Sequence, residues 1–245
     1  MPLSRAPFVL PGDEVIIERG LCHPYRNYSD FIADPEFERA SPTRFHTGLL
    51  PMPYSGNIAK AQIYILTLNP GFSPRGYYAE SRGRGVRQDR ICQLKQQNLD
   101  RAYPWSSLNP KHLWSADYWY RHFRDMALAM ADQHNITFTK ALSRISQKTA
   151  VLEFVPYHSK SFGIPAKVVE QMRSPKLMLN FVHDFVVPKA KQDEAIIIVA
   201  RQVKRWDLPK HKNIITYTPA QSRSAHLNMK SPGGKAIANK LQITI

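Results

Sequence analysis

Four short apolar runs, each rich in β-branched residues, constrain what this chain can fold into. Runs of this length fit buried strands, and the stretches between them carry apolar residues at helical spacing. Strands that alternate with helices predict an α/β fold. We therefore expect a three-layer sandwich around a central, mainly parallel sheet of four strands. The predicted strands span 62–68, 149–155, 195–200 and 213–217, and the predicted helices span 115–134, 166–172 and 175–185.

The rest of the chain is organised around this predicted core. We expect one domain over 1–245, with an irregular N-terminal layer over 1–60 and an α/β core over 61–245 that carries a basic insertion over 72–101. In sheets of this class, the loops at the carboxyl ends of the strands build the functional site. In this chain those loops hold Asn69, the segment 153–160 and the segment 218–226.

The formal charge of +15 indicates the kind of partner that the chain binds. Residues 1–60 hold six Lys or Arg against seven Asp or Glu, so the excess of positive charge lies further along the chain. A surplus of this size favours a polyanion, because basic side chains neutralise phosphates and release counterions. DNA is the partner that we expect, and a merely solubilising surface is the alternative.

The sequence argues against a membrane protein, a secreted protein and a disulfide-rich or metal-binding protein. The apolar run at 195–200 is far shorter than the ~20 residues of a membrane helix, and the N-terminus has no apolar secretion signal. Cys22 and Cys92 are too few for a disulfide framework or an all-cysteine metal site. We expect a cytoplasmic protein with no metal, no organic cofactor, no membrane contact and no obligate protein partner.

Five segments, in this order, resemble the motifs of the uracil-DNA glycosylase superfamily, and the likeness is greatest to its mismatch-specific branch with an Asn-Pro-Gly turn. They are LTLNPGF at 66–72, AYPWSSLNP at 102–110, VLEFVPYHSK at 151–160, AIIIVARQVKRW at 195–206 and IITYTPAQSRSA at 214–225. The resemblance covers roughly residues 60–225 and implies an enzyme that flips a base out of DNA and hydrolyses its glycosidic bond. Without the other segments, Asn-Pro-Gly would indicate only a turn that ends a strand.

The resemblance also implies the roles of single residues. Asn69 would position the water that attacks C1′, with Leu68, Gly71 and Phe72 beside the base. Trp105 would stack on the flipped base, with Tyr103 close by, as flipped bases are held by aromatic rings. For both rings the alternative is an ordinary place in the hydrophobic core.

Glu153 departs from the superfamily, which commonly has Asn at the end of this strand to read uracil. An ionised carboxylate only accepts hydrogen bonds, so it suits the amino group of cytosine and repels the O4 of uracil or thymine. The sequence therefore favours a cytosine-type base. Alternatively, Glu153 pairs with an arginine or with His158, which is itself a secondary candidate for base binding.

The insertion at 72–101 and the last motif supply the predicted DNA contacts. Arginines and tyrosines in the insertion fit phosphates and bases, and its length suggests room for a hydroxymethyl or glucosylated cytosine, as in antiphage defence. The alternative is a solvated mobile loop. The DNA-binding residues that we expect are Arg75, Arg82, Arg84, Arg87, Ser222, Arg223, Ser224, His226, Lys230 and Lys235.

We therefore expect a monofunctional DNA glycosylase that removes a modified or damaged pyrimidine and leaves an abasic site. Two other functions remain open on the sequence. One is an ordinary uracil or mismatch repair glycosylase, and the other is a catalytically silent DNA-binding protein of the same fold.

Overall fold

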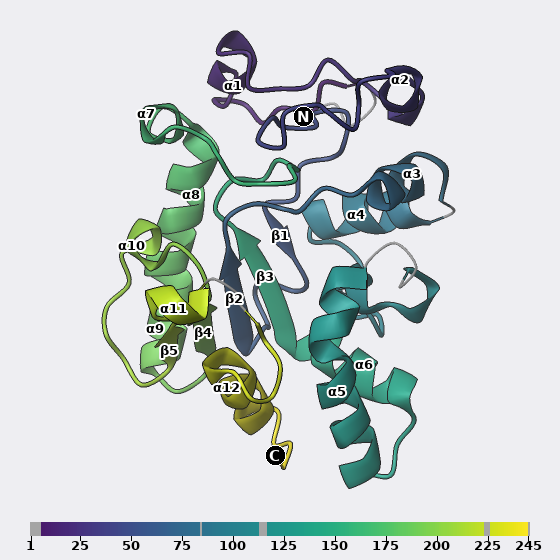
Figure 1. Cartoon of the computed structure of the whole chain (residues 1–245). Helices are drawn as coiled ribbons and strands as arrows, with labels where there is room; N and C mark the ends of the chain where they lie inside the picture. Colours follow the sequence, from purple (N-terminus) through teal and green to yellow (C-terminus); the bar gives the residue numbers. More distant parts are fainter. Residues whose placement is uncertain (1–5, 84, 113–116, 223–225, 245) are drawn as a thin grey trace. The chain divides into compact units, whose positions relative to one another are not determined.

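The computed structural model of the chain describes residues 6–83, 85–112, 117–222 and 226–244 (Figure 1). The chain packs into two compact units, each built from three segments. The first unit comprises Met1–Pro53, Leu68–Ile91 and Glu153–Leu179. The second unit comprises Tyr54–Thr67, Cys92–Leu152 and Asn180–Ile245.

A five-stranded, mostly parallel sheet forms the centre of the second unit, in the order β1-β3-β2-β4-β5. Its strands are β1 (Tyr54–Ser55), β2 (Ile63–Thr67), β3 (Thr149–Glu153), β4 (Ile196–Val199) and β5 (Ile214–Thr216). β2 pairs parallel with β4, and β4 parallel with β5, which confirms the predicted α/β class and mainly parallel sheet. The predicted number of four strands is wrong, because β1 adds an antiparallel edge next to β3.

Different helices cover the two faces of this sheet (Figure 1). Side chains alternate along a strand. Ile63 and Ile65 of β2 therefore share one buried core with α5, α6 and α12, while the hydroxyl of Tyr64 lies 3.3 Å from Lys189 Nζ of α9 on the opposite face. The helices are α5 (Asp117–Gln133), α6 (Phe138–Lys148), α9 (Val187–Lys191) and α12 (Pro232–Lys240).

The segment 72–101 folds as two helices, α3 (Pro74–Arg82) and α4 (Val86–Leu94), so its interpretation as a mobile loop is wrong. Ser73 caps α3 by accepting a hydrogen bond from Gly76 N, and Pro74 stands at the start of the helix, where its missing N–H costs nothing. The buried Glu80 carboxylate accepts a hydrogen bond from Leu50 N. A polar sequence therefore forms two helices over Pro74–Arg82 and Val86–Leu94.

Short helices account for most of the remaining regular structure. In the N-terminal layer, which we expected to be irregular, α1, α2 and β1 are four, six and two residues long. The predicted helix at 175–185 corresponds to α8, which continues through a π-helical turn into α9. The remaining helical elements are α1 (Val15–Glu18), α2 (Tyr28–Ala33), α7 (Ala166–Val169), α8 (Arg173–Phe181), α10 (Val203–Trp206), α11 (Pro219–Ser222), the 3-10 turns Ser106–Leu108 and Pro110–His112, and the π turn Val182–Val186.

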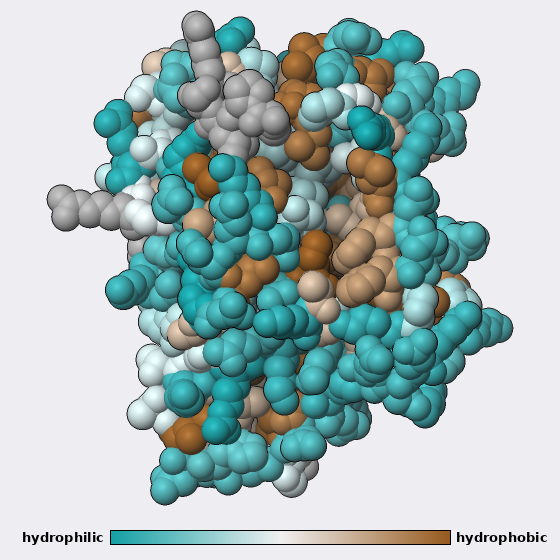
Figure 2. Space-filling model, turned by 180° about the vertical axis from the view of Figure 1, so that it is seen from behind, coloured by the Kyte–Doolittle hydropathy of each residue, from teal (hydrophilic) through white to brown (hydrophobic). Residues whose placement is uncertain are grey.

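On the face drawn in Figure 2, hydrophilic side chains surround smaller hydrophobic areas. Within the described parts of the chain, no helix combines the length and apolar character needed to cross a bilayer.

Candidate active site

The Asn-Pro-Gly turn follows β2 directly and is held by the segment that follows β3. Val155 N donates to Leu68 O at 2.8 Å, and Ser159 N donates to Pro70 O at 3.3 Å. Phe72 N in turn donates to Ser159 O at 3.2 Å, and Gly71 and Ser159 form a parallel bridge. All these residues belong to the first unit. Backbone hydrogen bonds thus fix the turn on both sides of Asn69.

The side-chain amide of Asn69 is oriented by three acceptors. Nδ2 lies 3.1 Å from Pro70 O, 3.1 Å from Tyr157 O and 2.9 Å from Ser159 Oγ. Ser159 Oγ donates its own proton to Ser161 O at 2.8 Å, so toward Asn69 it presents a lone pair. Because nitrogen faces all three acceptors, Oδ1 points the other way on a half-buried side chain. An amide oxygen that faces away from these acceptors can accept a hydrogen bond from a water molecule.

Replacing Ser159 by Ala should loosen this amide. One acceptor of Nδ2 disappears, and we expect a loss of about 1 kcal/mol of unfolding free energy, the net value of a typical hydrogen bond. In NMR spectra the side-chain amide signals of Asn69, assigned by their loss in Asn69→Asp, should shift and exchange faster with water. The exposed Ser161, which contributes only its carbonyl here, gives the matched control Ser161→Ala. Unchanged Asn69 signals in Ser159→Ala would contradict the contact.

Two buried histidines and Phe72 pack behind the turn. His158 is 4% exposed, and its Nδ1 lies 3.0 Å from Gly71 O, so the neutral ring donates from Nδ1. The ring of His46 stacks on Phe72 with centroids 3.5 Å apart and planes 4° from parallel. His46 N also donates to His158 O at 2.9 Å. The rings thereby join the N-terminal layer to the turn.

Both histidines are neutral at pH 7 because of their surroundings. Burial, followed by the positive charge of Arg90, lowers the pKa of His158 from 6.5 to about 4. Burial, followed by the nearby His23, lowers the pKa of His46 to about 2. A neutral imidazole beside Asn69 adds no positive charge to the turn.

Acid should therefore destabilise the fold. Below about pH 6.5 the unfolded chain binds protons on these histidines and the folded chain does not, so the stability is complete above pH 6.5 and falls toward pH 4. Between the two pKa values, each such histidine lowers the free energy of unfolding by about 1.4 kcal/mol for every pH unit of acidification. Urea unfolding between pH 7 and pH 5 measures the slope. In His158→Gln, whose amide can still donate to Gly71 O, we expect a slope lower by one histidine's share. An equal slope in both proteins would show that His158 is not held neutral.

Tyr157 anchors the same segment to the N-terminal layer. Its hydroxyl donates to Asp13 Oδ2 at 2.7 Å and accepts from Leu10 N at 2.9 Å. The buried Asp13 also accepts from Arg173 N and Ser174 N, where α8 begins. Burial, together with this carboxylate, raises the pKa of Tyr157, so its hydroxyl stays protonated as a donor. The carbonyl of Tyr157 that faces Asn69 is thus held firmly.

The other predicted base-binding residues of the first unit differ in exposure. Leu68 and Phe72 are half-buried, and Glu153 is 7% exposed at the end of β3. Gly71 is exposed, and a methyl group built on it would touch nothing within 4 Å. Open space at Gly71 means that a ligand can approach the backbone of the turn.

Of the arginines predicted to bind DNA in the insertion, Arg75 and Arg82 are exposed on α3. Arg87 is instead engaged within the protein. It lies 3.3 Å from the buried carboxylate of Glu80 and its guanidinium stands over the ring of Phe8. Arg90 also pairs with Glu80. A buried carboxylate is costly unless cations pair with it, so Arg87 has a structural role. Arg84 lies outside the described residues.

Tyr103 and Trp105, the predicted stacking residues, belong to the core of the second unit. Trp105 is 0% exposed, and its ring makes edge contacts with Trp119 and Phe123. Tyr103 packs against the same core and donates its hydroxyl to Thr139 O. The structure therefore places Trp105 inside the core and Tyr103 at its edge, in line with the second of the two interpretations that the sequence left open.

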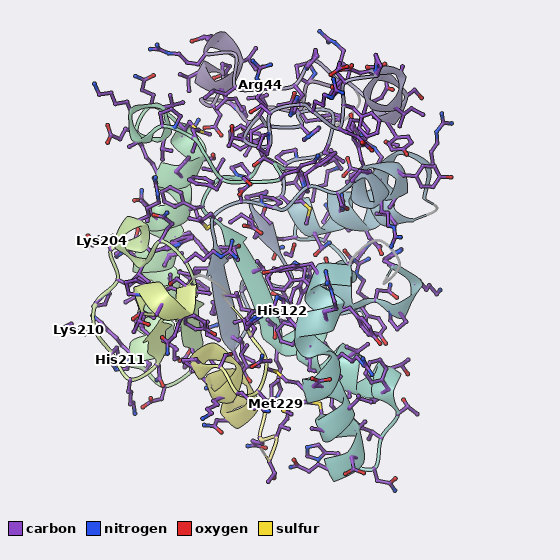
Figure 3. All side chains as sticks on the ribbon, in the orientation of Figure 1. Arg44, His122, Lys204, Lys210, His211 and Met229 are labelled. Atoms are coloured by element: carbon purple, nitrogen blue, oxygen red, sulfur yellow. The ribbon has the colours of Figure 1, made fainter. Side chains whose placement is uncertain are left out.

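The end of the last motif and the segment after it lie in the second unit and hold several exposed residues. Lys230 and Lys235 are exposed, as is His226, while the half-buried Ser222 ends α11. Arg223 and Ser224 lie outside the described residues. The ring of His226 is 6.4 Å from that of His122 on α5, whose pKa falls to about 4, mainly through burial. Figure 3 also shows Lys204, Lys210 and His211, from α10 and the loop before β5.

Sequence reasoning missed two residues at the turn, Ser159 and His46. Ser159 directly follows His158, so its neighbourhood was marked, but its bond to an amide ninety positions away leaves no local pattern. His46 lies in the layer expected to be irregular. Across the parts of the chain that the structure describes, no three His, Cys, Asp or Glu side chains gather as a metal site requires.

Comparison with known proteins gives no match, whether to a protein-family model, to a curated protein or to a solved structure.

Proposed function

We propose that this protein is a monofunctional DNA glycosylase that removes a modified or damaged pyrimidine and leaves an abasic site. The observation that carries the proposal is the half-buried amide of Asn69, whose nitrogen lies within hydrogen-bond distance of three acceptors, so that Oδ1 faces away from them. The sequence resemblance to the uracil-DNA glycosylase superfamily gives the amide its proposed substrate. The sheet, with Asn69 two residues after β2, agrees with that resemblance.

The proposed step breaks the bond between C1′ and the base nitrogen, and its electron pair leaves with the base. Water then bonds to C1′ and loses its proton to the base or to solvent. Asn69 cannot take that proton at neutral pH, so its part is to orient the water through Oδ1. The sugar must carry oxocarbenium character, which nearby phosphate charge and a preorganised polar site stabilise.

A cytosine-type base is the proposed target, since an ionised Glu153 accepts hydrogen bonds but cannot donate them. Glu153 is buried at the end of β3, and the proposed preference requires its carboxylate to stay ionised there, because a protonated carboxyl could donate to the O4 of uracil. Hydroxymethyl and glucosylated cytosine are the modified forms that we propose, and antiphage defence is the setting in which they would be met. The net charge of +15 supports DNA as the partner.

A panel of oligonucleotides tests the proposal. Duplexes carrying uracil, a T·G mismatch, plain cytosine, hydroxymethylcytosine or its glucoside are incubated with the protein and then cleaved with hot alkali at abasic sites. We expect cleavage of the modified cytosines. Cleavage at uracil alone would contradict the assignment of Glu153 and leave an ordinary repair glycosylase. No cleavage of any strand that the protein binds would leave a silent DNA-binding protein.

A further inference from the structure

The helix that follows the Asn-Pro-Gly turn exposes a face of two arginines and one tyrosine. α3 begins at Pro74, five residues after Asn69, and Arg75, Tyr78 and Arg82 stand at spacings of three and four on it. Residues spaced in this way share one side of a helix. All three are exposed, Tyr78 by 46%, whereas Tyr77, Ala79 and Glu80 are buried. We call Arg75, Tyr78 and Arg82 the α3 face.

A contact with the neighbouring helix α2 supports the exposed ring of Tyr78. The ring of Tyr28, on α2, meets that of Tyr78 edge to face with centroids 5.3 Å apart. Arg82 reaches Ser29 Oγ at 3.5 Å, the outer limit of a hydrogen bond. Asp30, the acidic residue of α2 next to Ser29, accepts hydrogen bonds from Arg26 N and Asn27 Nδ2 at the start of α2. Its carboxylate is therefore engaged within α2. The α3 face therefore presents a supported ring between two cations.

We propose that the α3 face binds a DNA strand, with Arg75 and Arg82 on backbone phosphates and Tyr78 stacked on a base between them. The seven-residue separation of the arginines spans about 10 Å of helix, so the two side chains can reach different phosphates of one strand. Stacking on an aromatic ring needs no particular base, so this contact holds DNA without reading it. The inference rests on the proposed function, because it takes DNA as the ligand and places it next to Asn69.

Binding to DNA that contains no target base tests the α3 face apart from catalysis. The probe is a fluorescein-labelled oligothymidine of about 15 nucleotides, and fluorescence anisotropy gives Kd at several salt concentrations. Tyr78→Ala and Tyr78→Leu should raise Kd about 5- to 150-fold, and Tyr78→Phe should bind as the wild type does, since only the ring is needed. Arg75→Gln and Arg82→Gln should each reduce the slope of log affinity against log salt by about 0.7, the value for one phosphate contact on a single strand.

Two controls separate the face from general effects of charge and folding. Ser81→Ala changes an exposed residue of α3 that carries neither a charge nor a ring, and Arg39→Gln removes an exposed arginine that pairs with Glu36 elsewhere in the first unit. Neither should change Kd or the slope beyond the error of the measurement. Thermal unfolding must match the wild type in every variant, and Tyr78→Leu keeps apolar packing against Tyr28 if Tyr78→Ala does not fold.

The outcomes distinguish this inference from the proposed function. Base release by the wild type, together with unchanged oligothymidine binding by all α3 variants, would overturn the α3 face and leave the glycosylase standing. Weaker binding by these variants without base release from any substrate would support the face and overturn the glycosylase. Absence of DNA binding by the wild type would overturn both.

Discussion

Asn69→Ala should lower the rate of base release by about 10²- to 10³-fold, the usual effect of removing one preorganised polar group from an active site. Alanine cannot accept a hydrogen bond from water, while the turn itself is held by backbone bonds from Val155 and Ser159. The fold should survive for that reason. Single-turnover rates on a hydroxymethylcytosine duplex, with the protein in excess over DNA, measure the loss.

DNA affinity is the second readout for Asn69→Ala. We expect Kd to stay within about twofold of the wild type, since the phosphate contacts are made by other residues. Asn239→Ala, an exposed asparagine on α12, is the matched control and should keep both the rate and Kd. A full rate in Asn69→Ala would remove Asn69 from the mechanism. Equal loss of rate and affinity would instead make it a binding residue.

Trp105→Ala should cost about 3–5 kcal/mol of unfolding free energy, as for other large aromatic residues truncated in a core. Trp105 has no exposed surface and packs against Trp119 and Phe123, so alanine leaves a cavity that its neighbours cannot fill. Its backbone is fixed as well, because Trp105 N donates to Ser146 Oγ at 3.0 Å. Urea unfolding followed by circular dichroism measures the change.

Trp105→Phe distinguishes the core role from the base-stacking role. Phenylalanine keeps an aromatic ring in the core, so the loss of stability should be clearly smaller than for alanine, with DNA affinity unchanged at temperatures where the protein is folded. If Trp105→Ala left the stability intact and weakened binding to substrate DNA, the core assignment would fail. The stacking role implied by the resemblance would then return.

Sequence alone predicted the strands of the sheet that lie in apolar runs. β2, β3, β4 and β5 all lie inside predicted runs, since buried strands of a mainly parallel sheet are apolar on both faces. β1 was missed because two residues carry no periodicity, and only its pairing with β3 makes it a strand. α3 and α4 were missed because their sequence is rich in charged residues, and no local pattern shows that Arg87 and Arg90 pair with the buried Glu80.

The candidate site was predictable in outline but not in its contacts. Order along the chain indicated that the segments after β2 and β3 lie together, and the backbone bonds between 68–72 and 155–159 agree. No local pattern shows that Ser159 donates to Ser161 O and so fixes which way the Asn69 amide points. Nor could spacing separate the buried Tyr77 from the exposed Tyr78 before α3 was known to be a helix.

The mass of the base released from DNA tests the central claim most directly. DNA that contains glucosylated hydroxymethylcytosine is incubated with the wild type or with Asn69→Ala, and the low-molecular-mass fraction is analysed by mass spectrometry. We predict the free modified base from the wild type, in equal amount to the abasic sites formed, and almost none from Asn69→Ala. No free base from any DNA that the wild type binds, or the same yield from Asn69→Ala, would contradict hydrolysis at Asn69.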